Sequence, residues 1–508
     1  MIPSFKNVIL ISVDDLRFDA LSAEKEDTYL RPYGLSKYRN TPTLDRIYRE
    51  GVVFSGCRST QVFTPQSHAS LLTGQYPPRH GLRKYFPGQL SPQSATLSEK
   101  FQAAGFTTFH SIDIPFAFLP QKVLRGGKTF VREKDESVID EIRSANDQGQ
   151  RTFSFFHMGD VHFPYGISQQ KHPQNQARQA VYLRLAKNLG ISLARKLLTA
   201  KESDITEVGL VLDQIHGKLI QRGVAGATLL PLYLSGVNSF SELRFRNFLR
   251  ILKERKILSD TLLVLTSDHG EVEQKFEGRT WFGHGLSLQE EAIRVPLIFW
   301  NSQNRLEPRR WSAPISSVDI APTLLELAGL REKFKNLDGF SRAKLVQGVS
   351  QKFCESECFT ESWHHPLSFL RKFAPLINFD HETFPSESSL NRYFDPVRLY
   401  RQSIRAGVHK LVEGPARARA LYNTYDDPLE RFNLLDLKTY RFAVNKCSAR
   451  KFIQFPDYEK ISTALVGRLA EINGTSPRKK IRIKKHKKKG LTLAGKSVAR
   501  QMKALGYF

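Results

Sequence analysis

The sequence predicts an α/β fold: a large mixed, mostly parallel sheet sandwiched by helices, with a small C-terminal α+β subdomain. Short apolar runs at 8–13, 106–109, 153–158 and 262–266 have the length and residue content of buried strands. Helical patterns lie between these runs, and such alternation is typical of a parallel sheet wrapped by helices. The 508 residues, 40% of them hydrophobic, suffice for one large core and a smaller unit.

The first 165 residues or so carry the clearest alternation of elements. The expected elements, in chain order, are a strand at Val8–Val13, a helix at Thr43–Glu50 capped by Thr41 or Thr43, helices at Ser67–Thr73 and 96–104, and strands at Phe106–Phe109 and Phe153–Met158. Residues 166–230 are polar, rich in Gln and Lys, and helical in period. We expect them to form a helical insertion that lies over one edge of the sheet.

The second half of the chain is expected to complete the sheet and then change character. The expected elements are an amphipathic helix at Ser239–Lys256, strands at 262–266 and Ala292–Trp300, a helix at Asp319–Leu327 stopped by Gly329, and short strands that include Ser403–Val412. This pattern predicts a large α/β domain over 1–355, a subdomain with a small antiparallel sheet over 356–465, and a basic tail over 466–508.

The formal net charge of +26 is unevenly spread along the chain. Residues 478–508 hold twelve Lys or Arg, and no acidic residue follows Glu471. The densest run, 478–489, is interpreted as a solubilising tail or a loose polyanion contact, because it lacks the interleaved aromatics that read bases. No apolar run reaches the length of a membrane-spanning helix, and the first strand begins too early to leave room for a signal peptide. We therefore expect a cytoplasmic protein.

Metal-binding residue types follow two of the predicted strands. Asp14 and Asp15 come directly after the first strand, and Asp268 and His269 come after the strand at 262–266. Parallel strands end at the same edge of a sheet, so these side chains are expected to meet there. Adjacent aspartates can share one ion only where the chain has left the strand and turned. The hydroxyl of Thr64 beside such an ion would gain a lower pKa, which is the layout of a metal-assisted hydrolase.

Six blocks in order over about residues 7–435 resemble the sulfatase family of the alkaline phosphatase-like superfamily. The blocks are Asn7–Arg17, Thr64–Gly74 with Tyr76–Gly81, Thr266–Glu271, Gly283–Gly285 with Glu291–Leu297, Ser317–Gly329, and Gly407–Leu411 with Leu421–Leu434. The resemblance implies an alkaline phosphatase-like fold. It also implies a hydrolase of sulfate esters or related phosphate and phosphonate esters.

The resemblance assigns roles to individual positions. Asp14, Asp15, Asp268 and His269 match the family's metal ligands, and Thr64 matches its nucleophile, which would be metal-bound. The implied cofactor is one divalent metal ion among manganese, calcium, zinc and magnesium, with manganese and calcium favoured.

Three histidines match further site positions of the family. His68 stands where an arginine usually supports the nucleophile, His162 matches a contact to the substrate anion, and His284 matches a position that faces the ester or leaving group. Imidazole suits such roles because its pKa lies near neutrality.

Three departures from the sulfatase pattern resemble the phosphoryl branch of the superfamily. Sulfatases oxidise Cys or Ser at the nucleophile position to formylglycine, and Thr64 has no route to that aldehyde. His269 replaces the usual asparagine, which shifts metal preference from calcium toward manganese or zinc. The lysine expected after the strand near Phe109 is absent from residues 109–115.

Several alternatives stay open at this point. One alternative hypothesis is a phosphodiesterase or phosphoryl transferase of the same superfamily. Another is a catalytically degenerate protein that binds polyanions. A two-metal site would need a further Asp and two His at fixed spacing, which cannot be placed, so a single ion is preferred. Asp160 is interpreted as structural, and Lys84 and Lys410 have no assigned role. The expected partner is a small-molecule or glycan sulfate or phosphate ester, and the oligomeric state is open.

Overall fold

The structure of the chain is a computed structural model, which describes part of the 508 residues. The described residues are 5–25, 29–83, 88–163, 165, 180–181, 184, 187–188, 226–276, 279–285, 287–330, 336–350, 353, 355–363, 400–414, 418–436 and 458–474. Most of the expected insertion at 166–230, the basic run at 478–489 and Lys84 lie outside them.

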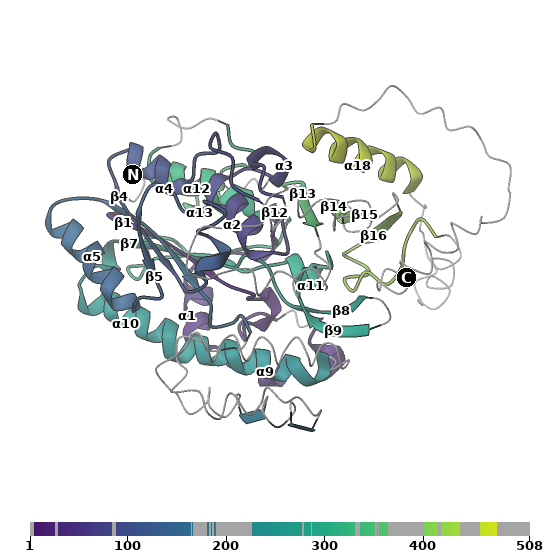
Figure 1. Cartoon of the computed structure of the whole chain (residues 1–508), viewed down its shortest axis with the longest axis horizontal. Coiled ribbons are helices and arrows are strands. Elements are labelled where there is room, and N and C mark those ends of the chain that lie inside the picture. The colour runs from purple at the N-terminus through teal and green to yellow at the C-terminus, as the bar shows by residue number, and fades with distance from the viewer. Residues whose placement is uncertain are drawn as a thin grey trace.

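An eight-stranded mixed sheet forms the centre of the molecule (Figure 1), in the order β11-β2-β10-β7-β1-β6-β4-β5. Its strands are β1 (Asn7–Val13), β2 (Val52–Phe54), β4 (Thr107–Ile112), β5 (Lys128–Val131), β6 (Thr152–Met158), β7 (Thr261–Thr266), β10 (Leu297–Trp300) and β11 (Arg309–Trp311). The five strands from β7 to β5 run parallel, and β10 is antiparallel to both its neighbours. The predicted fold class is confirmed.

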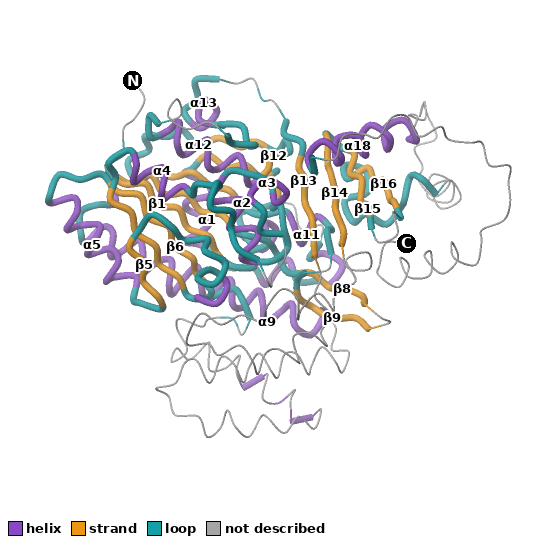
Figure 2. Tube along the Cα trace, turned by 45° about the horizontal axis from the view of Figure 1, so that its top comes forward, coloured by secondary structure: helices purple, strands orange, loops and turns teal. Residues whose placement is uncertain are grey.

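Both faces of this sheet are buried, which explains why its central strands are mostly apolar. In β1, Val8 and Leu10 belong to one core cluster, whereas Ile9, Ile11 and Val13 belong to the other. One face is covered by α1 (Pro42–Glu50), α5 (Asp135–Asp147), α9 (Gly226–Ser239), the π-helix η6 (Phe240–Phe245) and α10 (Arg246–Glu254). The other face is covered by α2 (Thr64–Thr73), α4 (Leu97–Ala103), α12 (Ile320–Leu327) and α13 (Ala343–Val346) (Figure 2).

Shorter elements connect this framework. They are the pair β3 (Cys57–Arg58) and β12 (Ile315–Ser316), the hairpin β8 (Val272–Phe276) and β9 (Arg279–Gly283), the helices α3 (Pro77–His80) and α11 (Glu290–Ile293), and 3-10 turns at Phe18–Ala20, Arg31–Tyr33, Ser36–Tyr38, Pro115–Ala117, Leu258–Asp260 and Ser317–Asp319. No helix among the described residues has both the length and the hydropathy to cross a bilayer.

The expected elements agree with the structure except at some boundaries. Helix α2 begins three residues before the expected Ser67, because Thr64 and Pro65 already adopt helical geometry after the extended residue Phe63. The expected strand at Ala292–Trp300 was wrong in its first part: residues 290–293 form α11, and the strand begins at Leu297. Periodicity cannot separate a short buried helical turn from a buried strand.

The second sheet packs beside the central one, at the right of Figure 1. Its antiparallel strands are β13 (Cys358–Trp363), β14 (Tyr400–Ala406), β15 (His409–Glu413) and β16 (Arg419–Asn423), and α18 (Tyr458–Ile472) covers it. The expected small C-terminal antiparallel sheet is confirmed. The run Ser403–Val412 is not one strand, however, because the chain turns back at Gly407 and Ser403 pairs with Val412 across the hairpin of β14 and β15. The proposed domain limits stay a prediction.

A buried group of charges joins the small sheet to the larger part of the molecule. Glu290 of α11 accepts hydrogen bonds from Arg58 at 2.5 Å and from Arg405 of β14 at 2.7 Å. Lys410 of β15 lies 3.5 Å from Glu290 and 2.6 Å from Glu430. Paired charges of this kind are costly to break once buried. Lys410, which the sequence left without a role, therefore serves the junction between the two sheets.

Candidate functional site

The chain turns sharply where β1 ends. The backbone N–H of Asp14 donates to the carbonyl of Met158 at 3.0 Å and so continues the sheet ladder. Asp15 has a φ of 63°, a left-handed conformation that non-glycine residues rarely adopt. This turn ends the strand alternation, so the two adjacent carboxylates need not point to opposite faces. The chain therefore leaves the strand and turns at these two aspartates, as their binding of one shared ion requires.

Asp268 links the end of β7 to the end of β1. Its Oδ1 accepts the backbone N–H of Asp15 at 3.2 Å and that of His269 at 2.9 Å. Ser267 reinforces the link, because its Oγ accepts from the backbone N–H of Leu16 at 3.0 Å and donates to the carbonyl of His269 at 2.7 Å. With Oδ1 held in this way, Oδ2 of Asp268 is the oxygen left for another partner.

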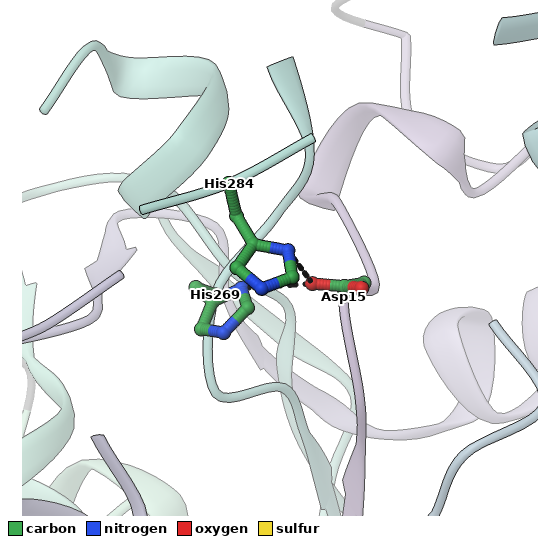
Figure 3. Close-up of side chains that lie close together, drawn as sticks. All are labelled: Asp15, His269 and His284. Atoms are coloured by element: carbon green, nitrogen blue, oxygen red, sulfur yellow. Dashed lines mark ion pairs between the residues drawn. The ribbon is translucent and has the colours of Figure 1, made fainter. Parts of the chain in front are cut away.

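Donor atoms from separate segments converge at this edge of the sheet. His269 places Nδ1 at 2.9 Å from Asp15 Oδ1 and Nε2 at 3.3 Å from Asp268 Oδ2. His284, which follows β9, places Nδ1 at 3.2 Å from Asp15 Oδ1 (Figure 3). Two overlapping donor sets result, Asp14 with Asp268 and His269, and Asp15 with His269 and His284, each with its ligand atoms within 4.8 Å of one another.

These donor atoms lack other partners. Asp14 Oδ1, both oxygens of Asp15, Asp268 Oδ2 and both nitrogens of His269 are buried and form no hydrogen bond with any described residue. Buried polar atoms are nearly always paired, and unpaired carboxylate oxygens are especially costly. A mixed set of carboxylate and imidazole donors fits a divalent cation.

The electrostatics of the carboxylates reflect how they are crowded together. Burial alone would raise the pKa of Asp15, but His284, His269 and His162 lower it well below its usual range. Burial and the neighbouring Asp14 raise the pKa of Asp268 above its ordinary value. Two of the carboxylates thus differ in how readily they ionise, and a cation would favour the ionised form of both.

Thr64, the predicted nucleophile, is the first residue of α2 and is only 6% exposed. The ring of the preceding Phe63 packs edge-on against His284, with centroids 6.1 Å apart. Gly285 permits this approach, because at φ +101° a Cβ there would lie 2.6 Å from the Phe63 ring. The start of α2 therefore lies beside His284.

His68 lies one turn into α2 and is completely buried. Its Nδ1 is 2.7 Å from the carbonyl of Thr64 and its Nε2 is 2.8 Å from Ser12 Oγ. Burial lowers the pKa of His68 to about 3, so the neutral ring donates to Thr64 and accepts from Ser12. Nδ1 is also 3.8 Å from Asp268 Oδ2, so the first turn of α2 lies close to the candidate donor residues. Support of the nucleophile by His68 stays a prediction.

His162 follows β6 and lies at the margin of the site. Its Nε2 is 3.9 Å from Asp15 Oδ2, and its side chain is 23% exposed. The loop that carries it is anchored by Asp113, whose Oδ2 accepts from the backbone N–H of Gly159 at 2.7 Å. Asp160 of the same loop accepts from Arg244 at 2.6 Å and belongs to neither donor set, which agrees with its structural interpretation.

Sequence reasoning missed two residues of the site. His157, inside β6, bonds Asp14 Oδ2 at 3.0 Å through Nε2, because β6 pairs with β1 and sets His157 opposite Ser12. A histidine within an apolar strand was the available signal. Glu271 is buried, accepts from the hydroxyl of Tyr165 at 3.0 Å and lies 3.6 Å from His284 Nδ1. Its position three residues after Asp268 was the signal.

Comparisons with known proteins agree with this arrangement. The Sulfatase family model matches residues 6–330. An arylsulfatase of Clostridium perfringens (strain 13 / Type A) is 23% identical over 407 residues, which cover 67% of this chain and 78% of that protein.

Solved structures show the same fold. The phosphonate monoester hydrolase of Agrobacterium radiobacter superposes with a TM-score of 0.56 at 17% identity, covering 92% of this chain and 95% of the other. A protein solved in complex with its substrate D-glucosamine-2-N,6-O-disulfate superposes with a TM-score of 0.61 at 16% identity, covering 93% and 98%. The family model spans more than half of the 508 residues, and its match includes the strand ends that carry the donor atoms, so this chain belongs to the Sulfatase family of ester hydrolases.

Proposed function

We propose that this chain is a metal-dependent hydrolase of sulfate esters or related phosphate and phosphonate esters, with Thr64 as its nucleophile. The main support is the convergence of unpaired carboxylate and imidazole atoms at the carboxyl edge of the sheet, beside the first turn of α2. Asp14, Asp15, Asp268 and His269 would hold one divalent cation. When bound, the cation supplies positive charge that neutralises the ester anion and lowers the pKa of a nearby hydroxyl.

The side chains divide the remaining work. The Oγ1 of Thr64 releases its proton to solvent and attacks the phosphorus or sulfur atom, the bond from that atom to the ester oxygen breaks, and the leaving oxygen takes a proton from His284 or His162. Water then attacks the ester on Thr64 and gives a proton back to that histidine, and the released Thr64 oxygen takes up a proton from solvent. Burial alone would lower the pKa of His284, but Asp15 and Glu271 raise it well above its ordinary value.

Phosphate and phosphonate esters are the favoured substrates within this class. Thr64 cannot be oxidised to the aldehyde that sulfatases use, and His269 adds an imidazole where an all-oxygen shell would suit calcium. The phosphonate monoester hydrolase of similar fold supports testing this chemistry first. Phosphodiester cleavage or phosphoryl transfer at the same site is the second candidate, favoured by the same two residues.

The test is a substrate and metal panel. The purified chain would be assayed on an aryl sulfate, an aryl phosphate, a phosphodiester and a phosphonate monoester, each with manganese, zinc, magnesium and calcium. We expect turnover that depends on added metal and is highest on a phosphorus ester. A dominant aryl sulfatase rate would contradict the preference for phosphorus, and absence of turnover on all four substrates would contradict the proposal itself.

Variants of Thr64 separate direct attack from other routes. Thr64→Ala should lower kcat by at least about 10³-fold, whereas Thr64→Ser should keep measurable turnover because it retains the hydroxyl. Thr463→Ala on the exposed side of α18 is the matched control and should behave as the parent. A Thr64→Ala variant with full activity would mean that water, not Thr64, attacks the ester.

The substrate class is also a proposal. A small molecule or a glycan ester is the proposed substrate class, and the protein solved with a disulfated glucosamine supports including sugar esters in a wider screen. The cytoplasmic location and the polyanion contact through 478–489 stay predictions.

A further inference from the structure

We propose that the site binds its cation in either of two overlapping positions, and that the position formed by Asp15, His269 and His284 selects zinc-like transition metals. This inference rests on the cation of the proposed function and adds which residues hold which class of ion. His284, which the sequence assigns to the ester or leaving group, thereby becomes a ligand for one class of metal.

The two positions differ in the chemistry of their donors. Asp14, Asp268 and His269 offer two carboxylates and one imidazole, whereas Asp15, His269 and His284 offer one carboxylate and two imidazoles. Figure 3 shows the imidazoles of His269 and His284 beside the carboxylate of Asp15, and the two ring centroids lie 4.5 Å apart. Magnesium, calcium and manganese suit carboxylate oxygens, whereas imidazole suits zinc, iron and copper, so manganese is expected at the position with two carboxylates.

His269 belongs to both positions, and this makes them alternatives. Its Nδ1 faces Asp15 and its Nε2 faces Asp268, and neither nitrogen forms a hydrogen bond with a described residue. A neutral imidazole has a lone pair on only one nitrogen at a time. When one nitrogen binds the ion, the other carries hydrogen and can donate to the opposite carboxylate, as histidine ligands usually do. One ion per chain follows.

The carboxylate of Asp15 is well placed to complete the histidine-rich position. Both of its oxygens are buried and form no hydrogen bond with a described residue, and Oδ1 lies within 3.2 Å of a nitrogen of each histidine. The His284 side chain is 21% exposed, so this position lies nearer to solvent than the fully buried one. An ion there occupies His284, and proton donation would fall to His162 alone.

Metal binding to the full-length chain, stripped with a chelator, tests the proposal. Zinc and manganese would each be titrated by calorimetry, with bound metal counted by elemental analysis. His284→Ala should weaken zinc binding by about 10-fold or more and leave manganese within about 2-fold. Asp14→Asn should weaken manganese binding by about 10-fold or more and leave zinc binding within about 2-fold. His409→Ala on β15 is the control, since His409 belongs to neither donor set, and it should change neither affinity.

A second substitution keeps the test decisive if His284→Ala folds poorly. His284→Asp replaces nitrogen by oxygen and should shift the preference from zinc toward manganese, with circular dichroism confirming the fold. Equal effects of His284→Ala on both ions, or two zinc ions bound per parent chain, would overturn the inference. If His284→Ala binds zinc as the parent does and has normal turnover, the two-position inference is wrong and the proposed function stands. If the parent chain binds no metal, the proposed function is wrong as well.

Discussion

Gly285→Ala is a small change that should disturb the site strongly. Gly285 follows His284 and has a φ of +101°, which side chains rarely adopt. The Cβ of alanine would lie 2.6 Å and 2.8 Å from two atoms of the Phe63 ring, whereas ordinary contact begins at 3.4 Å. The ring precedes Thr64 in the chain, so relief of this overlap moves either the His284 loop or the residue before the nucleophile.

The magnitude follows from two separate costs. The left-handed backbone costs a non-glycine residue about 1–3 kcal/mol. Overpacking adds about 1–3 kcal/mol if the Phe63 ring stays in place. If the ring moves instead, its contact with His284 is lost, and a shift of about 1 Å at a catalytic group can lower the rate by about 100-fold. We therefore expect kcat/KM to fall by about two orders of magnitude.

Gly105→Ala is the matched control for the backbone term. Gly105 also has a left-handed φ of +88°, but a Cβ there meets nothing within 4 Å. Urea unfolding and ester hydrolysis would be measured for both variants. Gly285→Ala should lose more stability than Gly105→Ala by about 1–3 kcal/mol and should alone lose activity. Equal stability losses, with activity of Gly285→Ala within 2-fold of the parent, would refute the packing argument.

Three further predictions concern charge and metal. Arg244→Ala leaves the buried Asp113 and Asp160 and the partly buried Asp135 without their shared partner. It should lower the free energy of unfolding in urea by about 3–5 kcal/mol, whereas the exposed control Arg250→Ala should cost at most about 0.5 kcal/mol. Burial raises the pKa of Glu291 from its ordinary 4.5 to about 7 in the folded protein. The stability that the protonated Glu291 contributes should therefore be present below pH 4.5 and be lost as the pH rises through 7. Glu291→Gln should flatten that part of the stability–pH curve, and an unchanged curve would contradict the shift. Chelation should lower the thermal unfolding temperature, and metal restored at 100 times its Kd should add about 2.7 kcal/mol of stability; no response to metal would argue against the cation.

The sequence alone predicted the parts of the fold that depend on local pattern. The runs at Val8–Val13 and 262–266 are mostly apolar, which predicted central strands covered on both faces. The structure buries every residue of both runs. Strands of that kind pair in parallel, and parallel strands end at one edge. It followed that Asp14 and Asp268 would be neighbours, although 253 residues separate them.

The tertiary structure decided which atoms of those residues are available. The left-handed turn at Asp15, the pairing of Asp268 Oδ1 with two backbone N–H groups, and the burial of both His68 nitrogens depend on neighbours that come from distant segments. None of them leaves a periodic trace in the sequence. His157 is the clearest case, since only the register of β6 against β1 brings it to Asp14.

The physical reason is a difference in range. Burial of a strand or helix face is a property of a few consecutive residues, and hydrophobic periodicity records it. Selection of a donor atom depends on hydrogen bonds and unpaired oxygens between side chains that only folding brings together. The chain's residues thus fixed the sheet edge at which the donors gather, and only the folded arrangement decided that His269 and Asp15 face His284 there.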